Sequence, residues 1–249
     1  MRFLLLVILM LFTILSNATP TKLVVRAKAK DAKFIGSSIG GALVVVRKTT
    51  TGEILAEGMT QGSTGNTSLI MKEPHERYKS LVEDNTAKFE ALLDIDEPVF
   101  VTIEVTAPFN QPQSSVRAST QLWLIPGKDI DEEGVVLEIS GFIVNVITPQ
   151  THESLSGGKS NISANIVMMC GCPLTNGGLW DAEKIEVKAI IKQEGELLTE
   201  LPLQVKTKPN TFEQEYAFSK AGNYEIIIYA YDARTGNTGV GKVNFMVSN

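Results

Sequence analysis

The residues with the most specific chemistry in this chain of 249 residues lie in one short segment, Met168-Met169-Cys170-Gly171-Cys172-Pro173. Cys170 and Cys172 are the two cysteines of the sequence, and a single glycine separates them. In an oxidising compartment, two thiols this close form a disulfide, take part in thiol exchange or bind a soft metal ion. The sequence therefore offers one candidate site, and the elements around it decide how it is used.

Strand geometry limits what the cysteine pair can do. The segment Ile162–Val167 alternates as a half-buried strand, and its regular continuation would place the two cysteines on one face, with Cα atoms about 6.6 Å apart. This separation is near the upper end of the disulfide range, roughly 4.4–6.8 Å. Gly171 lets the backbone bend, and Pro173 ends the strand because it lacks an N–H donor. We expect a strand end that turns into a loop, with both sulfurs accessible.

Three hypotheses fit the pair, and the sequence leaves all three open. In the first, a strained and readily reduced disulfide acts in thiol exchange. In the second, Cys170 and Cys172 bind Cu(I) with thioether help from Met168 or Met169, and His152 is a further ligand in the same half of the chain. In the third, the pair is a passive disulfide or two buried thiols, and the methionines fill the core. The segment lacks the second Cys/His pair of a zinc site and the Cys-x-x-Cys of a thioredoxin.

The N-terminus has the pattern of an export signal. Arg2 supplies a positive charge, the run Phe3–Leu15 is apolar, and Ser16-Asn17-Ala18 ends in small residues. We expect cleavage after Ala18 and a periplasmic or secreted protein. The apolar run is shorter than a membrane span, and no later segment reaches spanning length, so the mature chain is predicted to have no span.

Charge and motifs exclude several classes of function. The formal net charge is −5, and no Lys/Arg stripe is interleaved with aromatic residues, so nucleic acid is not an expected partner. The sequence contains no phosphate loop and no His-Glu-x-x-His motif. We therefore expect a protein without hydrolytic activity and not an enzyme, except for the thiol-exchange hypothesis.

Short strand patterns separated by Gly, Pro, Asn and Ser run through most of the chain. Ala42–Val46 is rich in β-branched residues, and Val99–Val105 alternates between apolar and polar residues. Such regular short strands predict an all-β fold of two tandem antiparallel β-sandwich domains rather than βαβ units. The segment 74–93 is the exception, and we interpret it as a long loop with at most one or two helical turns.

In the first half, strand patterns and turns follow one another at Gly40–Val46, at Thr51–Thr60 and at Gly65-Asn66-Thr67. This pattern, over about 22–124, resembles transthyretin-like or carboxypeptidase-regulatory β-sandwiches. Thr51-Gly52 is also a suitable hairpin turn on physical grounds, because glycine allows a positive φ between two β-rich runs. The resemblance implies a fold, and such modules are usually non-catalytic.

The last hairpin of the second half has a Gly-x-Tyr strand entry at Gly222 and an Ala-x-Asp exit at Asp232 into Thr235-Gly236-Asn237. With this hairpin, the second half resembles bacterial immunoglobulin-like domains over about 135–248. Together the patterns predict the following organisation: signal peptide 1–18, transthyretin-like sandwich 19–126, linker 127–134, and immunoglobulin-like sandwich 135–249 with the cysteines.

The sequence thus predicts an exported binding protein whose second domain holds a Cu(I)-type or thiol-redox site. The alternative is a structural or cell-surface interaction module with a partner in the cell envelope, in which Cys170 and Cys172 form a passive disulfide. Trp123 and Trp180 are both predicted to fill the cores of their sandwiches.

Overall fold

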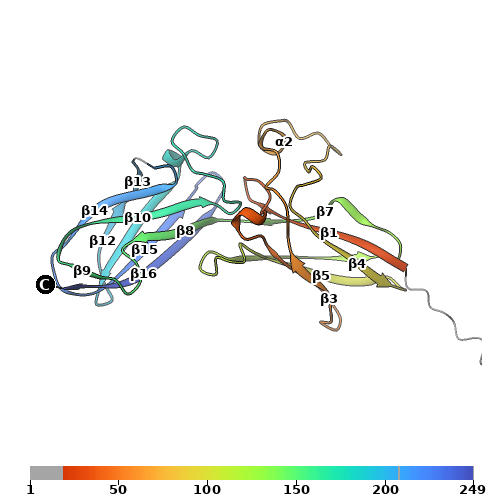
Figure 1. The fold of residues 1–249 in the computed structure, drawn as a ribbon, viewed down its shortest axis with the longest axis horizontal. Helices are drawn as coiled ribbons and strands as arrows, with labels where there is room; N and C mark the ends of the chain where they lie inside the picture. The colour runs from red at the N-terminus through yellow and green to blue at the C-terminus, as the bar shows by residue number, and fades with distance from the viewer. Residues whose placement is uncertain (1–18, 207, 249) are drawn as a thin grey trace, which may run out of the picture.

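The computed structural model describes residues 19–206 and 208–248. The predicted signal peptide 1–18 and its cleavage site lie outside the described residues. The rest of the chain forms two β-sandwiches placed end to end, with the start of β1 (Thr19–Ala29) and the C-terminus at opposite ends (Figure 1). The predicted all-β fold is therefore confirmed. Within the described residues, no helix is long and apolar enough to cross a membrane.

The first sandwich packs a three-stranded sheet, ordered β4-β1-β7, on a four-stranded sheet, ordered β3-β2-β5-β6. Its elements are β1, η1 (Ser37–Ile39), β2 (Leu43–Lys48), β3 (Ile54–Met59), α2 (Thr67–Met71), β4 (Phe89–Ile95), β5 (Val99–Ala107), β6 (Val116–Leu124) and β7 (Ile130–Ile139). Strand β5 shows why these residues form a sandwich. Every second residue from Val99 to Ala107 is buried, while the residues between them face outward.

The hairpin and loop predictions for the first half have separate outcomes. Thr51-Gly52 lies in the turn that joins β2 and β3, and Gly52 has a φ of 77°. The segment 74–93 begins as a loop but ends in β4, which pairs with β1. The short helix α2 precedes this loop, and the Asn66 side chain caps it by accepting hydrogen bonds from the backbone N–H groups of Ser68 and Leu69.

The segment 127–134, which the sequence predicts to be a linker, is in part a strand. Its second half belongs to β7, which runs parallel to β1 and completes a sheet of the first sandwich. The register shifts between the pairs Leu23–Ile130 and Val25–Val135, so residues 131–134 bulge from the ladder. The acidic residues remain largely exposed while the strand continues past them. The chain passes between the sandwiches at 140–141.

A buried arginine on β1 holds this bulge in place. Arg26 is 3% exposed, and its guanidinium donates to four carbonyl oxygens, at 2.6 Å (Thr86), 3.0 Å (Ala87), 3.0 Å (Glu132) and 3.0 Å (Glu133). Burial lowers the pKa of Arg26, and the nearby Glu133 charge opposes this effect. Because four of its five N–H donors have carbonyl acceptors, the charge can be buried without an ion-paired carboxylate.

The second sandwich packs a four-stranded sheet, ordered β13-β14-β10-β8, on a five-stranded sheet, ordered β12-β11-β15-β16-β9. Its elements are β8 (Phe142–Thr148), β9 (Ser154–Ser156), β10 (Gly158–Met168), η2 (Ala182–Lys184), β11 (Glu186–Gln193), β12 (Glu196–Pro202), β13 (Gln204–Val205), β14 (Thr211–Phe218), β15 (Gly222–Tyr231) and β16 (Thr238–Ser248). The predicted last hairpin is the pair β15 and β16. Aromatic rings of Phe218, Tyr224 and Phe245 pack together in its core.

Strand pairing in both sandwiches is antiparallel, except that β7 pairs parallel with β1 and β9 pairs parallel with β16. The buried side chains of the two sandwiches form one continuous apolar cluster, which runs through the place where they meet. The ends of the sandwiches therefore share a packed junction, and the cysteine segment lies in it.

Candidate site at the junction of the two sandwiches

The cysteine segment is a tight turn at the end of β10. The Gly171 N–H donates to the Met168 carbonyl at 2.7 Å, and the Met168 N–H donates to the Cys172 carbonyl at 3.0 Å. Gly171 has a φ of 77°, which glycine adopts without strain. Two closing hydrogen bonds and a left-handed glycine are the features of a three-residue hairpin loop with a bulge.

Cys170 and Cys172 are joined in a disulfide, with their Cα atoms 5.4 Å apart. The turn accounts for this distance, which is shorter than the value expected for a straight strand. The prediction of accessible sulfurs is wrong, because the two residues are only 1% and 5% exposed. The turn lies against the first sandwich, because a Cβ added to Gly171 would lie 3.4 Å from Ile39 Cδ1.

The structure brings some of the predicted metal ligands together and leaves one apart. Met168 and Met169 are buried beside the disulfide, at 2% and 1% exposed. His152 instead donates its backbone N–H to Asn244 on β16, whereas the turn lies near Thr238 at the start of that strand. Six residues of strand separate these places by about 20 Å. His152 therefore does not belong to the cysteine site. Among the described residues, no group of three or more His, Cys, Asp and Glu is arranged to hold a metal ion.

Trp180 lies on the loop after the cysteine turn and crosses the junction. It is 8% exposed, and its indole N–H donates to the Asp31 carbonyl of the first sandwich at 2.8 Å. The prediction that Trp180 is buried is confirmed, but its ring joins the sandwiches instead of filling only one. Trp123 is 58% exposed on the outer face of β6, so the core position predicted for it is wrong.

A buried asparagine from the β15–β16 turn provides a second polar connection. Asn237 is fully buried, and its side chain donates to the Lys30 carbonyl at 3.1 Å and accepts from the Gly141 N–H at 2.8 Å. Gly141 lies where the chain crosses from the first sandwich to the second. A Cβ added to Gly141 would lie 2.7 Å from the Thr238 carbonyl and 3.0 Å from Met169 Cε. The side-chain amide of Asn237, in the turn of the last hairpin, thus connects Lys30, which follows β1, with Gly141 at the crossing.

Three charged groups lie around this connection. Asp232 accepts two hydrogen bonds from the Arg234 guanidinium, at 3.1 Å and 3.0 Å. Burial of Asp232 raises its pKa, but the hydrogen bonds from Arg234 outweigh burial and hold the pKa below its ordinary value of 3.8. Burial raises the pKa of Asp31 in the first sandwich, and the Arg234 charge opposes that rise. Arg234 therefore acts on carboxylates of both sandwiches.

Two further hydrogen bonds connect the loop after β5 with the second sandwich. Gln113 donates its side-chain amide to the Lys242 carbonyl at 3.2 Å, and Ser114 accepts from the Val144 N–H at 3.3 Å. Contacts from several separate loops therefore hold the junction. Such an arrangement fixes one orientation of the sandwiches around the buried disulfide.

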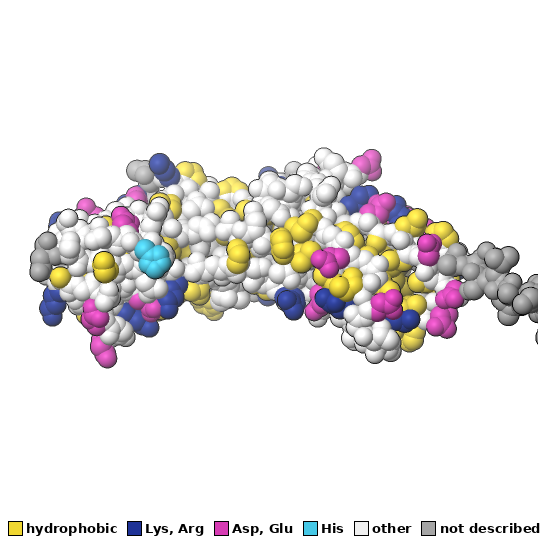
Figure 2. Space-filling model, turned by 60° about the horizontal axis from the view of Figure 1, so that its bottom comes forward, with side chains coloured by type: hydrophobic (Ala, Val, Ile, Leu, Met, Phe, Trp, Pro, Cys, Tyr) yellow, Lys and Arg dark blue, Asp and Glu magenta, His cyan; other side chains and the backbone are white. Residues whose placement is uncertain are grey.

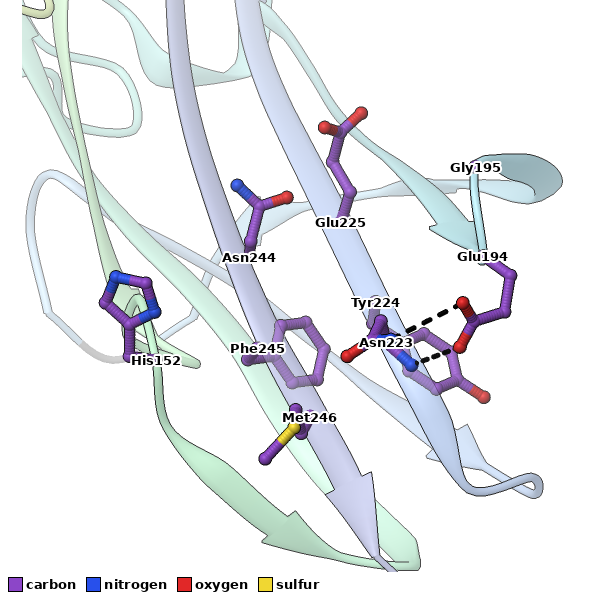
Figure 3. Close-up of a pocket in the computed structure, with 9 residues that line it drawn as sticks. All are labelled: His152, Glu194, Gly195, Asn223, Tyr224, Glu225, Asn244, Phe245 and Met246. Atoms are coloured by element: carbon purple, nitrogen blue, oxygen red, sulfur yellow. Dashed lines mark hydrogen bonds between the residues drawn. The ribbon is translucent and has the colours of Figure 1, made fainter.

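A surface hollow of about 490 Å³ lies away from the junction, at the other end of the second sandwich (Figure 3). Its lining residues are His152, Glu194, Gly195, Asn223, Tyr224, Glu225, Asn244, Phe245 and Met246. Glu194 is occupied by hydrogen bonds from the backbone and side chain of Asn223, at 2.7 Å and 3.4 Å. Tyr224 and Phe245 belong to the core beneath. The other carboxylate of the hollow, Glu225, is paired with Lys192 and Lys242, so both of its carboxylates already have partners.

Sequence reasoning missed Asn237 and Asp31 because each contacts residues distant in sequence, and neither has a local motif. The bend at the cysteines could be predicted from the sequence. Gly171 follows Met169 and Cys170 at the end of a strand, and a glycine as the third residue of a short loop is typical of a bulged hairpin. That signal predicts the bend correctly, but it contains no information on what covers the turn.

No protein-family model matches the chain, and no curated protein matches it. Among solved structures, the fibronectin(III)-like modules of Clostridium thermocellum CbhA are 11% identical, with coverage of 91% of this chain and 94% of theirs at a TM-score of 0.30. Titin domains Z1Z2, solved with telethonin, are 11% identical, with coverage of 92% and 95% at a TM-score of 0.25. An engineered protein is 11% identical at a TM-score of 0.34, and the match spans 24% of its length. The assignment of two β-sandwiches rests on the strand pairing described above.

Proposed function

We propose that the protein is an exported, non-enzymatic structural and interaction module in which two sandwiches are held in one orientation. The Cys170–Cys172 disulfide is a passive part of the junction. The observation that carries the proposal is the burial of both cysteines, at 1% and 5% exposure, within a turn closed by two backbone hydrogen bonds. A thiol-exchange site needs an accessible sulfur, because the reaction proceeds by attack of one thiolate on another sulfur.

The outer face of the five-stranded sheet is the surface that we assign to a protein partner in the cell envelope. Ile190 pairs with Ile227 at its centre, and Tyr229 pairs with Val240, which is 49% exposed. Ion pairs surround this apolar strip, among them Glu225 with Lys192 and Lys242. An apolar centre within a polar rim is the usual anatomy of a protein interface.

Alkylation of the reduced protein tests the passive role of the disulfide. In the folded protein treated with dithiothreitol and then iodoacetamide, we expect no labelling of Cys170 or Cys172 until denaturant is added, because the reductant cannot reach the sulfurs, and we expect no catalysis of insulin reduction. A matched control is Leu179→Cys on the neighbouring loop, where the side chain is 46% exposed and should react at once. Rapid native alkylation of Cys170 or Cys172, or turnover of insulin, would contradict the proposal.

A second candidate function is Cu(I) binding by the reduced turn. It is favoured by four sulfur-bearing side chains buried within five residues, Met168, Met169, Cys170 and Cys172. Two thiolates and two thioethers form a donor set suited to Cu(I). Anaerobically reduced protein is then expected to take Cu(I) from a chromogenic chelator, and Cys170→Ser/Cys172→Ser to lose this ability. If the reduced wild type takes up no Cu(I), this candidate is excluded.

A further inference from the structure

We propose that the outer face of the sheet β3-β2-β5-β6 binds a neutral polysaccharide, with Trp123 as the stacking platform. This proposal goes beyond the function above and does not depend on the junction. The face belongs to the first sandwich, and Figure 2 shows hydrophobic side chains there in separate groups between charged ones. The residues concerned stand on two directly paired strands, β5 and β6.

The platform is an aromatic pair at one end of the face. Trp123 on β6 is paired with Phe100 on β5, and their ring centroids lie 5.1 Å apart at an interplanar angle of 40°. Trp123 is 58% exposed, although an indole contributes most stability when it is buried. Phe100 supports the indole from one side, so the exposed ring is held in position for a ligand. A sugar ring presents a C–H face that fits such a surface.

Polar side chains continue the same face away from the aromatic pair. Gln121 lies two residues before Trp123 on β6, so both side chains point outward. The side-chain amide of Gln121 donates to the Thr102 hydroxyl at 3.0 Å. The hydroxyls of Thr102 and Thr49 are 2.8 Å apart. The next pair along the strands is Ser119 with Glu104. From Trp123 to Arg117 the row extends about 20 Å, enough for several sugar units.

The charges on this face compensate one another. Glu104 lies 3.2 Å from the Arg47 Nε atom and 3.8 Å from an Arg117 guanidinium nitrogen. Val45 of β2 pairs with Glu57 of β3 on one side and with Glu104 of β5 on the other, so both glutamates lie on this face. The two arginines therefore balance the charges of the two glutamates. A face whose charges cancel in this way favours a neutral ligand over an anionic one.

The apolar area is also too small for a stable protein interface. A stable interface buries about 800 Å² per partner, of which somewhat more than half is apolar. A fully exposed aromatic side chain offers about 150–250 Å², but Trp123 is 58% exposed and Phe100 is half-buried, so the two rings together offer well below that apolar share. A carbohydrate requires less apolar area, because its hydroxyls use the amide, hydroxyl, guanidinium and carboxylate groups beside the ring. The combination of one exposed indole and a polar row therefore selects a glycan chain.

Affinity electrophoresis of the mature protein in gels containing soluble β-glucan, xylan, mannan or alginate tests this proposal. We expect retardation by at least one of the three neutral polysaccharides and not by alginate. Trp123→Ala should weaken the affinity at least about tenfold, which corresponds to about 1.4 kcal/mol. Gln121→Ala should weaken it by a smaller factor. Tryptophan fluorescence should change on binding in the wild type and not in Trp123→Ala.

The matched control is Leu92→Ala on β4, which removes a 70%-exposed apolar side chain from the other sheet. Circular dichroism confirms that each variant is folded. The proposal is overturned if no neutral polysaccharide retards the protein, if only alginate does, or if Trp123→Ala and Leu92→Ala bind equally well.

Discussion

The two tryptophans of this chain show how differently its two interesting regions are built. Trp180 lies in a loop at the junction, is 8% exposed and donates to the other sandwich, whereas Trp123 lies in a regular strand and is 58% exposed. The loop residue is the structural one, and the strand residue is available for binding. Burial therefore follows from what the tertiary structure places against a side chain and not from residue type.

Alternation explains the orientation of Trp123. Leu124 is fully buried and Leu122 is partly buried, so the residue between them must face outward. Trp180 has no such constraint, because it precedes η2 in a loop, and its position depends on the carbonyl of Asp31. The comparison predicts that substitutions at the junction affect stability, and that substitutions on the outer face affect binding.

The largest expected difference is between Trp180→Ala and Trp123→Ala. We expect Trp180→Ala to lower the free energy of unfolding by about 3–5 kcal/mol, because it leaves a cavity in a packed junction. Trp123→Ala should cost about 1 kcal/mol or less, since it removes an exposed ring and one aromatic contact. Denaturant unfolding followed by circular dichroism measures both values. Equal losses in the two variants would remove the distinction between the regions.

Asn237→Ala is the next largest expected effect. The substitution leaves the Gly141 N–H and the Lys30 carbonyl without their partner in a buried place, at a cost of about 2 kcal/mol. Because those groups join the sandwiches, we also expect a wider distribution of interdomain distances by small-angle X-ray scattering. Asn176→Ala, in an exposed loop of the same sandwich, is the control and should leave both quantities unchanged.

Much of the fold was predictable, because its strands are regular. The alternation in β5 and the glycine turn between β2 and β3 are local patterns, and each determined a correct element. The strand β4 was missed because its residues follow a charged loop and include exposed Leu92. The strand β7 was interpreted as a linker because its acidic bulge resembles a loop, and only its pairing with β1 and its contacts with Arg26 reveal a strand.

Less of the candidate site was predictable. The nearness of Cys170 and Cys172 in sequence correctly indicated a pair, and Gly171 correctly indicated a bend. Their turn lies next to Ile39, more than a hundred positions away, and no local pattern connects these two segments. The same limit applies to His152, which shares a domain with the cysteines but lies at its other end. Distances along a strand are predictable from sequence, and contacts between loops are not.

Removal of the disulfide should have a moderate effect. The loop it closes is only three residues long, so the entropy model gives about 1.5 kcal/mol of stabilisation. We expect Cys170→Ala/Cys172→Ala to lower the free energy of unfolding by this amount, and to leave glycan binding at Trp123 unchanged. Mass spectrometry of the wild type checks that the bond is present. A loss as large as that of Trp180→Ala would mean that the disulfide and not the packing around it holds the junction.

The smallest effect, and the sharpest test of the charges at the junction, is the dependence of stability on pH. Hydrogen bonds from Arg234 keep the pKa of Asp232 below 3.8, so the folded state binds fewer protons there than the unfolded state, and stability falls as the pH drops through that range. Burial raises the pKa of Asp31, so this residue has the opposite sign and costs stability once the pH exceeds its unfolded value. In Asp232→Asn, the melting temperature should therefore decrease less than in the wild type when the pH is lowered from 7 to 3. In Asp31→Asn it should rise near neutral pH, because the buried charge is removed. If both variants shift the profile in the same direction, the two carboxylates do not act on the junction as the structure indicates.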